Sequence, residues 1–385
     1  MERPMIQLKQ ERNQLFTDIY DGLKPKRIPI RIQVTHEAAI QYCKMDLKHT
    51  QWDKTAYFSF MDKVSAQLET DLTPVSMNVR TPAYYQILES EAFVMSSSGV
   101  LQHPEVKSME AKEYDEFIED PYSFILTKAL PRVYKGFGGD PVRKSLNLAK
   151  AMAAYEDYKK AQLVAMSKIN EKYGYAHLPI GGVTEAPYDF LADVLRSFTE
   201  ISKDIRRCPD KIAEACDAVL PYLQRCAVSP MSSNYNRTMI PVHMPPFMNT
   251  KQFEKYFWPS FKQLVQFIYE RGSNCWLLLQ GDMVRYIDYI NELPGNPEVR
   301  HEYGDMKEVL ERTNKKHIIS GLYPVTMLET SSEKECMDYA RKTVEILGQN
   351  GNYIFNFDKP ILSLDENSMQ NLRAVIATVR KYGEY

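Results

Sequence analysis

Three absences set limits on this 385-residue chain. No stretch approaches the roughly 18 consecutive apolar residues of a membrane-spanning helix, and the charged start MERPMIQLKQERNQ lacks the apolar core of a signal peptide. Neither sign of charge is in excess, because 48 Lys and Arg face 50 Asp and Glu, so there is no basic footprint for nucleic acid or an anionic membrane. We therefore expect a cytoplasmic protein with neither nucleic-acid nor membrane partners.

Several catalytic and ligand-binding motifs are also missing. The six cysteines lie far apart and never in CxxC spacing, which favours free thiols over a disulfide or zinc framework. The sequence has no GxGxxG or GxxxxGKS/T phosphate loop, no HExxH zinc motif and no GxSxG nucleophile elbow. These absences argue against the nucleotide-binding and hydrolytic chemistries that depend on such motifs.

What the chain does contain is eight strand-length apolar runs separated by amphipathic helical stretches. Each run breaks into polar, Gly or Pro residues at its C-terminal end; the runs cover residues 28–34, 71–78, 175–183, 238–247, 275–282, 299–305, 316–324 and 352–358. Strands that alternate with helices pair in parallel, and eight such units close a barrel. We predict an α/β fold in which residues 1–385 form a single (β/α)8 TIM barrel domain.

Two segments fall outside the repeating pattern. The apolar stripe in residues 1–25 predicts an N-terminal helix. The stretch 79–174 is a long insertion near the barrel mouth, after the second strand. Its first part, 79–110, has β-branched and aromatic residues around a Ser-Ser-Ser-Gly turn, which predicts a hairpin over the mouth, and 141–173 predicts a long amphipathic helix. Whether 79–110 forms a lid stays open.

Polar side chains follow almost every strand, where barrel enzymes carry their chemistry. His243 is either a packed or a catalytic histidine, and Asp282 and Asp305 are either acids or helix N-caps. Tyr323 is a further candidate acid. The candidates for substrate binding are Arg31, His36, Asn78, Arg80, Glu185, Gln280, Asp358 and Lys359. Each has a structural explanation too, such as a solvated ion pair for Asp358 and Lys359, but together they are typical of a barrel active site.

The order and spacing of several blocks resemble the uroporphyrinogen decarboxylase-like superfamily, which contains that decarboxylase and corrinoid-linked methyltransferases. The blocks are Arg27-Ile28-Pro29, Asp71 and residues 186–212, 253–272, 278–282, 319–328 and 371–383. The resemblance covers most of the chain and implies a (β/α)8 barrel with its cleft at the C-terminal ends of the strands.

Two motif sets of the superfamily are not present. The arginine-rich motif that follows strand one in the decarboxylases corresponds to RIQVTHEAAIQY, where only Arg31 is cationic, so we do not expect a substrate with many carboxylates. The zinc ligands of the methyltransferases correspond to Leu278, Gln280 and Lys359, which cannot form a thiolate–imidazole site. We expect no family zinc triad; His243 is the best candidate ligand for any other metal.

The resemblance favours a methyltransferase that passes a methyl group from a small methoxylated or methylated substrate to a corrinoid cofactor on a partner protein. Such a transfer needs an acid for the departing oxygen or nitrogen, with His243, Asp282, Asp305 and Tyr323 as candidates, and Gln280 and Asn78 as orienting donors. The alternatives are a decarboxylase of a tetrapyrrole or a smaller acid, held by Arg31 or Arg80, and a non-catalytic barrel that binds a tetrapyrrole or a partner. Relatives of this kind are commonly homodimers.

Overall fold

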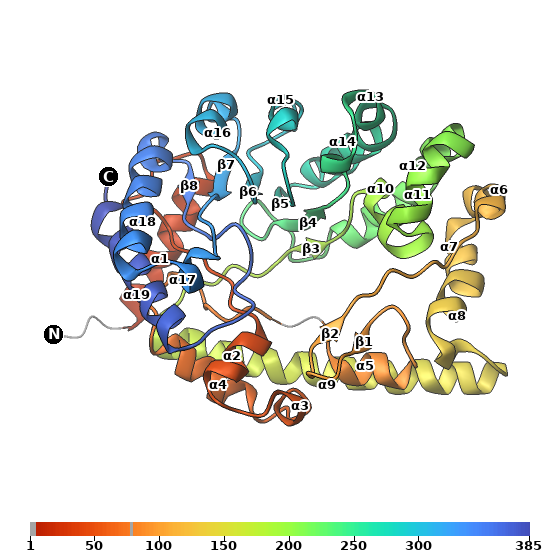
Figure 1. Cartoon of the computed structure of the whole chain (residues 1–385), viewed down its shortest axis with the longest axis horizontal. Helices are drawn as coiled ribbons and strands as arrows, with labels where there is room; N and C mark the ends of the chain where they lie inside the picture. The colour runs from red at the N-terminus through yellow and green to blue at the C-terminus, as the bar shows by residue number, and fades with distance from the viewer. Residues whose placement is uncertain (1–4, 78–79) are drawn as a thin grey trace.

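The computed structural model describes residues 5–77 and 80–385 and shows a parallel sheet with helices around it (Figure 1). Six strands pair in chain order: β3 (Gly182–Val183), β4 (Thr238–Val242), β5 (Cys275–Leu279), β6 (Glu298–His301), β7 (Ile318–Gly321) and β8 (Tyr353–Ile354). All five pairings between them are parallel. This arrangement confirms the predicted α/β fold of the TIM-barrel type.

The first two predicted strands extend the ladder through isolated bridges only. Ile30 pairs with Phe355, and Val34 pairs with both Val75 and Ile361, all in parallel. The prolines at 29 and 74 explain part of this irregularity, because proline cannot donate a ladder hydrogen bond. At the far edge, the N–H of Ala176 donates to the carbonyl of Asp71 at 2.8 Å, so the segment leading into β3 contacts the second predicted strand.

Helices fill the connections and cover the outside of the sheet. They are α10 (Pro187–Phe190), α11 (Phe198–Arg207), α12 (Pro209–Ala227), α13 (Thr250–Gln252), α14 (Trp258–Glu270), α15 (Ile287–Ile290), α16 (Met306–Thr313), α17 (Met327–Thr330), α18 (Glu333–Leu347) and α19 (Glu366–Tyr382). Their apolar faces form two large clusters. One packs around β7 and β8 with α16 to α19, and the other packs around β4 to β6 with α10, α11, α12 and α14.

The N-terminal part adds α1 (Met5–Tyr20), α2 (His36–Tyr42), α3 (Leu47–Thr50) and α4 (Tyr57–Ser65). Helix α1 lies within the predicted N-terminal helix, and its Arg12 donates to the carbonyl of Gly174 at 3.0 Å. That contact ties α1 to the end of the long insertion.

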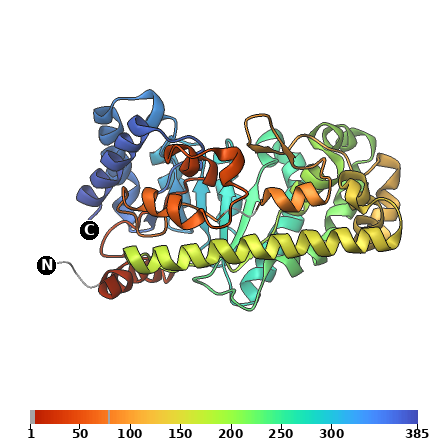
Figure 2. The same ribbon diagram turned by 90° about the horizontal axis from the view of Figure 1, so that it is seen from below.

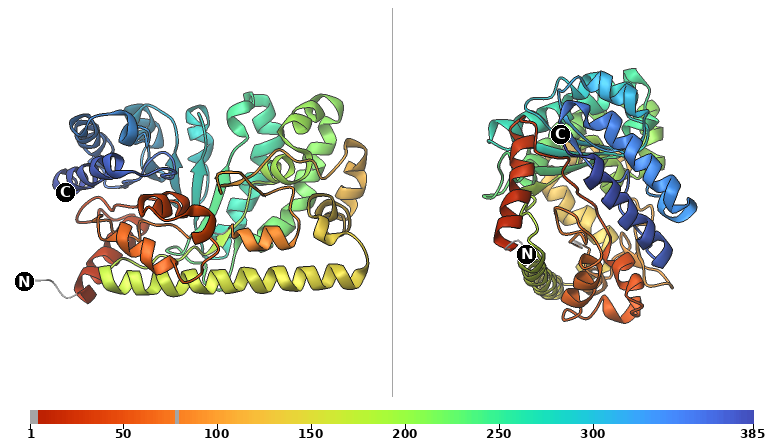
Figure 3. Two further views of the ribbon diagram at one scale, coloured as in Figure 1. Left: turned by 60° about the horizontal axis from the view of Figure 1, so that its bottom comes forward. Right: turned by 90° about the vertical axis from the view of Figure 1, so that its left-hand side faces the viewer.

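The insertion contains α5 (Pro82–Ile87), the antiparallel hairpin of β1 (Val94–Met95) and β2 (Leu101–Gln102), α6 (Tyr114–Glu119), α7 (Pro121–Phe124), α8 (Leu130–Val133) and α9 (Pro141–Tyr173). Helix α9 crosses the length of the molecule, from α6–α8 at one end to α1 at the other (Figures 2 and 3). Asp140 caps it by accepting from the N–H groups of Val142 and Arg143, and Gly174 ends it at a φ of 60°, in the left-handed region that favours glycine. The hairpin and the long helix are therefore confirmed.

All six cysteines are free thiols. None of the described helices combines the length and the apolar composition that crossing a membrane requires.

Candidate active site

Contacts across the barrel identify the side chains that point inward. Arg31 donates to Glu298 at 2.8 Å and Arg300 donates to Gln33 at 2.6 Å, although β7 and β8 separate residues 28–34 from β6 in the sheet. These contacts therefore pass through the interior. Successive side chains of a strand point to opposite faces of the sheet, and residues paired between neighbouring strands point to the same face. The pairing therefore shows which residues at the ends of the other strands also point inward. The inward side chains just beyond the strands are Glu185, His243, Gln280 and Glu302.

His243 directly follows β4 and is held on both sides of its ring. Its Nδ1 lies 2.8 Å from Oε1 of Gln280, and its Nε2 lies 3.8 Å from Oδ2 of Asp193. The fully buried Asp189 accepts from the backbone N–H groups of His243 at 2.8 Å and Met244 at 3.1 Å. Asp189 thus fixes the turn after β4, and the amide and carboxylate neighbours fix the orientation of the imidazole.

Glu185 is the group in this cluster that is best suited to hold a proton. Its Oε2 is buried and has no hydrogen-bond partner among the described residues. Burial raises the pKa of Glu185 to about 7; the nearby carboxylate of Asp193 raises this pKa further, and His243 and Arg80 oppose the rise. A buried carboxyl group without donors favours its neutral form. Glu185 can therefore donate a proton near neutral pH.

Burial also raises the pKa values of the two aspartates in the following segment. For Asp193, the nearby His243 and His103 oppose the rise. For Asp189, the rise is large, the Asp193 carboxylate adds to it, and the two backbone N–H groups oppose it. Three carboxyl groups at spacings of four residues thus differ in their partners: Glu185 has a bare oxygen, Asp189 takes backbone donors and Asp193 faces an imidazole.

The β1–β2 hairpin brings aromatic side chains to the same cluster. The ring of His103, just after β2, stacks on Phe93 with centroids 4.5 Å apart, and Phe93 contacts Tyr85 at 4.6 Å. The Arg80 guanidinium lies 4.8 Å from the Phe93 ring. Burial lowers the pKa of His103, as do the charges of Arg80 and His243, whereas Asp193 raises it. His103 therefore lies within electrostatic reach of the His243–Asp193 pair.

A second cluster of polar side chains lies at the ends of β5, β6 and β8. Lys359 forms an ion pair with Glu302 at 2.7 Å, and Glu302 also accepts from the N–H of Gly281. Asp358 accepts from the backbone N–H groups of Val325 and Lys359, and burial raises its pKa. The structure thus brings together Glu185, His243, Gln280 and Arg80 on one side of the mouth, and Asp358 and Lys359 on the other.

Other predicted site residues lie elsewhere. Arg31 is buried and pairs with Glu298, the first residue of β6, while its guanidinium lies 4.5 Å from the Trp276 ring. That position is at the N-terminal end of the barrel interior, away from the mouth. His36 is buried against Tyr57 and Phe60. Both residues are therefore part of the packed interior.

The three remaining candidate acids make local contacts. Tyr323 is fully buried and its hydroxyl donates to the carbonyl of Cys336 at 3.0 Å. Asp305 caps α16 by accepting from the N–H groups of Lys307 and Glu308, and Asp282 accepts from the N–H of Val284 at 3.1 Å. Asn78 lies outside the described residues. The catalytic and binding roles assigned from the sequence stay predictions.

Sequence reasoning missed Asp193, His103 and Arg300. Asp193 could have been found, because it lies four residues after Asp189 on a helical segment and so shares its side. His103 follows a hairpin whose placement depends on tertiary packing, and no local pattern marks it.

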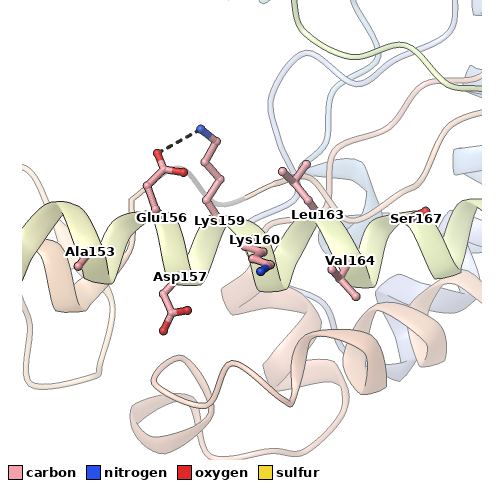
Figure 4. Close-up of a pocket in the computed structure, with 8 residues that line it drawn as sticks. All are labelled: Ala153, Glu156, Asp157, Lys159, Lys160, Leu163, Val164 and Ser167. Carbon is pink, nitrogen blue, oxygen red and sulfur yellow. Dashed lines mark hydrogen bonds and ion pairs between the residues drawn. The ribbon is translucent and has the colours of Figure 1, made fainter.

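A separate hollow lies beside α9 (Figure 4). It has a volume of about 590 Å³ and is lined by Ala153, Glu156, Asp157, Lys159, Lys160, Leu163, Val164 and Ser167. A single helix supplies this whole lining, and Glu156 and Lys159 form an ion pair of 3.4 Å on it. We place the candidate active site at the barrel mouth because acid, base and aromatic side chains from several strands meet there.

The positions that correspond to the zinc ligands of related methyltransferases do not fit zinc. Leu278 is buried in β5, Gln280 contacts His243, and Lys359 pairs with Glu302. A hydrocarbon, an amide and an ammonium group cannot replace thiolate and imidazole ligands. Within residues 5–77 and 80–385, no group of three or more His, Cys, Asp or Glu side chains is arranged to hold a metal ion.

Comparisons with known proteins agree with the fold. Residues 139–382 match the model of the uroporphyrinogen decarboxylase (URO-D) family. The solved structures that match include a methyltransferase from Methanosarcina mazei, with a TM-score of 0.60 and 12% sequence identity, over 96% of this chain and 98% of that chain. At this identity the likeness shows a common fold. No curated protein matches the chain.

Proposed function

The chain belongs to the uroporphyrinogen decarboxylase family, and from this premise we propose that it is a methyltransferase that moves a methyl group from a small methoxylated or methylated substrate to a corrinoid protein. The observation that carries the proposal is Glu185, a buried carboxyl group with a pKa raised to about 7, beside the His243–Asp193 pair. The shared fold with a methyltransferase supports it.

The proposed reaction breaks the bond between the methyl carbon and an oxygen or nitrogen of the substrate. The electron pair of that bond stays on the heteroatom, which must take up a proton as the methyl group leaves. Glu185 supplies this proton. His243, oriented by Gln280 and Asp193, can hydrogen-bond the heteroatom and hold the methyl group in line with its acceptor.

The surroundings of strand one favour a small substrate over a polycarboxylate. Arg31 is the single cation in residues 31–42, and it is engaged with Glu298 and the hydroxyl of Tyr20 inside the barrel. A tetrapyrrole with many carboxylates needs several free arginines at the mouth. The interior ion pair therefore weighs against decarboxylation of such a substrate.

The rim of the mouth suits a large, partly apolar partner. Phe198, Phe247, Tyr303 and Leu362, which follow β3, β4, β6 and β8, have 43%, 69%, 61% and 69% of their surface exposed. Exposed apolar residues grouped around a site are typical of docking surfaces. The partner's corrinoid would supply the metal centre that accepts the methyl group, and these residues would contact the partner.

Anaerobic spectroscopy tests the proposal. A Co(I) corrinoid carrier is mixed with the protein and a panel of methoxylated aromatics and methylamines, and the corrinoid spectrum is followed. We expect conversion of the carrier to its methylated form with one substrate class. The matched control for the variant Glu185→Gln is Glu311→Gln, which changes an exposed glutamate of α16.

Conversion by the wild-type protein and by Glu311→Gln, with loss of conversion in Glu185→Gln, would support the proposal. Absence of conversion with every donor, when the carrier is competent and the protein is folded, would count against it. Decarboxylation of a smaller acid would then be the next candidate, since a proton donor is equally needed where a proton replaces carbon dioxide.

A further inference from the structure

Arg300 is a buried cation whose guanidinium forms no ion pair with any of the described carboxylates. It lies in β6, with 5% of its surface exposed, and its side chain points into the barrel, where Nη1 donates to Oε1 of Gln33 at 2.6 Å. No carboxylate among the described residues forms an ion pair with it. A buried charge without a counter-charge is costly, and natural proteins seldom keep one without a use.

The carboxylates whose charges act on Arg300 are those of Glu302, Asp358 and Glu298, and each has other partners. Asp358 accepts from the backbone N–H groups of Val325 and Lys359. Glu298 pairs with Arg31 at 2.8 Å and accepts from Tyr20 at 2.8 Å. Glu302 pairs with Lys359 at 2.7 Å. Burial lowers the pKa of Arg300 to about 10, and the nearby carboxylates only partly oppose this change. The guanidinium thus remains charged at neutral pH, and its positive charge is incompletely compensated.

The hydrogen-bond donors around Arg300 are also incompletely used. Nε of Arg300, Oγ of Ser320 and Nδ2 of Asn356 are buried and have no partner among the described residues. Ser320 lies next to Arg300 in the β6–β7 ladder, and Asn356 is two residues beyond Ile354, the partner of Ser320 in β8. All three atoms can donate, and they lie on the inward side of β6, β7 and the segment that follows β8. Such a set is complementary to an acceptor with negative charge.

We propose that Arg300 and Ser320 form a binding site for the carboxylate group of a small acid, inside the barrel below the mouth. Because Nη1 is occupied by Gln33, the edge formed by Nε and Nη2 is left, and two parallel N–H donors match the two oxygens of a carboxylate. A phosphate dianion shares this chemistry, but its second negative charge would be repelled more strongly by Glu302, Asp358 and Glu298, so a carboxylate is favoured. Arg300 pairs with Leu278, two residues before Gln280, so a bound acid would lie one layer below His243 and its neighbours.

Binding of simple anions tests this site without any assay of activity. The thermal midpoint of the full chain is measured with sodium acetate and sodium benzoate, with sodium phosphate as a second arm, at constant ionic strength set by sodium chloride. We expect the midpoint to rise by about 2 °C at a carboxylate concentration of roughly ten times the dissociation constant. The inference does not depend on methyl transfer, so its failure and that of the proposed function are separable.

Three variants make the test specific to the site. Arg300→Gln should abolish the rise in the thermal midpoint. Ser320→Ala should raise the dissociation constant for acetate about five-fold, because one donor is lost. Arg341→Gln, which changes an exposed ion pair of α18, should behave as wild type. The proposal is overturned by equal midpoints in acetate and chloride, by a rise with phosphate alone, or by a full rise in Arg300→Gln. If Arg300→Gln does not fold, Ser320→Ala decides, and an unchanged dissociation constant overturns the proposal.

Discussion

At the scale of single residues, hydrogen-bond partners rather than residue type separate the acids at the barrel mouth. Glu185, Asp189 and Asp193 belong to one short segment. Asp189 accepts hydrogen bonds from two backbone N–H groups, and Asp193 faces His243. The buried Oε2 of Glu185 has no donor within the described part of the chain. This environment gives a carboxyl group that keeps its proton near neutral pH and has an oxygen from which to deliver it.

Replacing Glu185 should therefore remove catalysis. We expect Glu185→Gln to lower the rate of methyl transfer by at least about 100-fold, the usual contribution of a positioned acid. In the wild type, the rate should fall as the pH rises through about 7, because Glu185 then loses the proton that it donates. The residual rate of the variant should not show this fall. Single-turnover kinetics at several pH values measures both effects.

Asp282→Asn is the informative comparison, because the sequence alone left Asp282 open as an acid or a helix N-cap. Asp282 is exposed and accepts from the N–H of Val284, a role that asparagine can retain. We expect this variant to keep its rate within a few-fold. Loss of activity in Asp282→Asn and its retention in Glu185→Gln would place the acid after β5 instead of after β3.

The sequence could predict the positions of side chains at the mouth where strand ends could be recognised, while their roles stay predictions. Glu185, His243 and Gln280 were all named because they follow apolar runs, and they do lie together. Arg31 was named for the same reason. However, its guanidinium pairs with Glu298, the first residue of β6, so it lies at the opposite end of the barrel interior from the mouth. Alternation predicts the face of a side chain, whereas its level in the barrel depends on register between strands that are distant in sequence.

At the scale of elements, the β1–β2 hairpin adds aromatic contacts to the mouth. His103 stacks on Phe93 and lies near Asp193 and His243, although its own side chain is exposed. We expect His103→Ala to raise KM several-fold while kcat and the melting midpoint change little. Gln102→Ala, exposed at the end of β2, is the matched control. Unchanged KM in His103→Ala would mean that the hairpin does not touch the substrate.

Helix α16 offers a test of capping against catalysis. Asp305 accepts from two backbone N–H groups at its start, at 2.9 and 3.1 Å. Asp305→Ala should lower the free energy of unfolding by about 1 kcal/mol and leave turnover unchanged. Urea denaturation and the methyl-transfer assay measure the two effects. A loss of turnover with unchanged stability would instead support the catalytic role that the sequence allowed.

Elements with strong local signals were predicted well. Helix α9 begins at Pro141 after the capping Asp140 and ends before Gly174, and its predicted bounds agree with the structure. The first two strands are shorter than predicted, in part because prolines interrupt their hydrogen bonding. A pattern of apolar residues does not show that a backbone N–H donor is missing.

At the scale of the whole molecule, buried histidines should make the fold sensitive to acid. Burial lowers the pKa of His36 and of His301 to about 4, and that of His317 well below its ordinary value. The unfolded chain takes up protons on these residues below pH about 6.5, whereas the folded chain does so only near pH 4 or lower. The free energy of unfolding should therefore fall as the pH drops from about 6.5 toward 4.

A single variant can isolate this contribution. His301 and His317 have their Nε2 atoms 3.4 Å apart in the interior. In His301→Gln, the slope of unfolding free energy against pH between about 6.5 and 5 should be smaller than in the wild type, whatever the absolute stability. Urea denaturation across this range measures it, and an unchanged slope would show that His301 is protonated in the folded protein as readily as in the unfolded chain.

Direct titration of Glu185 tests most sharply whether the barrel mouth holds a proton donor at neutral pH, and it needs no substrate. Infrared difference spectra of the whole protein between pH 5 and 9 report protonated carboxyl groups, and Glu185→Gln identifies the band of this residue. We predict a carboxyl band that titrates at about pH 7 in the wild type and is absent from the variant. Wild-type spectra that are indistinguishable from those of Glu185→Gln across this range would contradict the assignment of Glu185 as the acid.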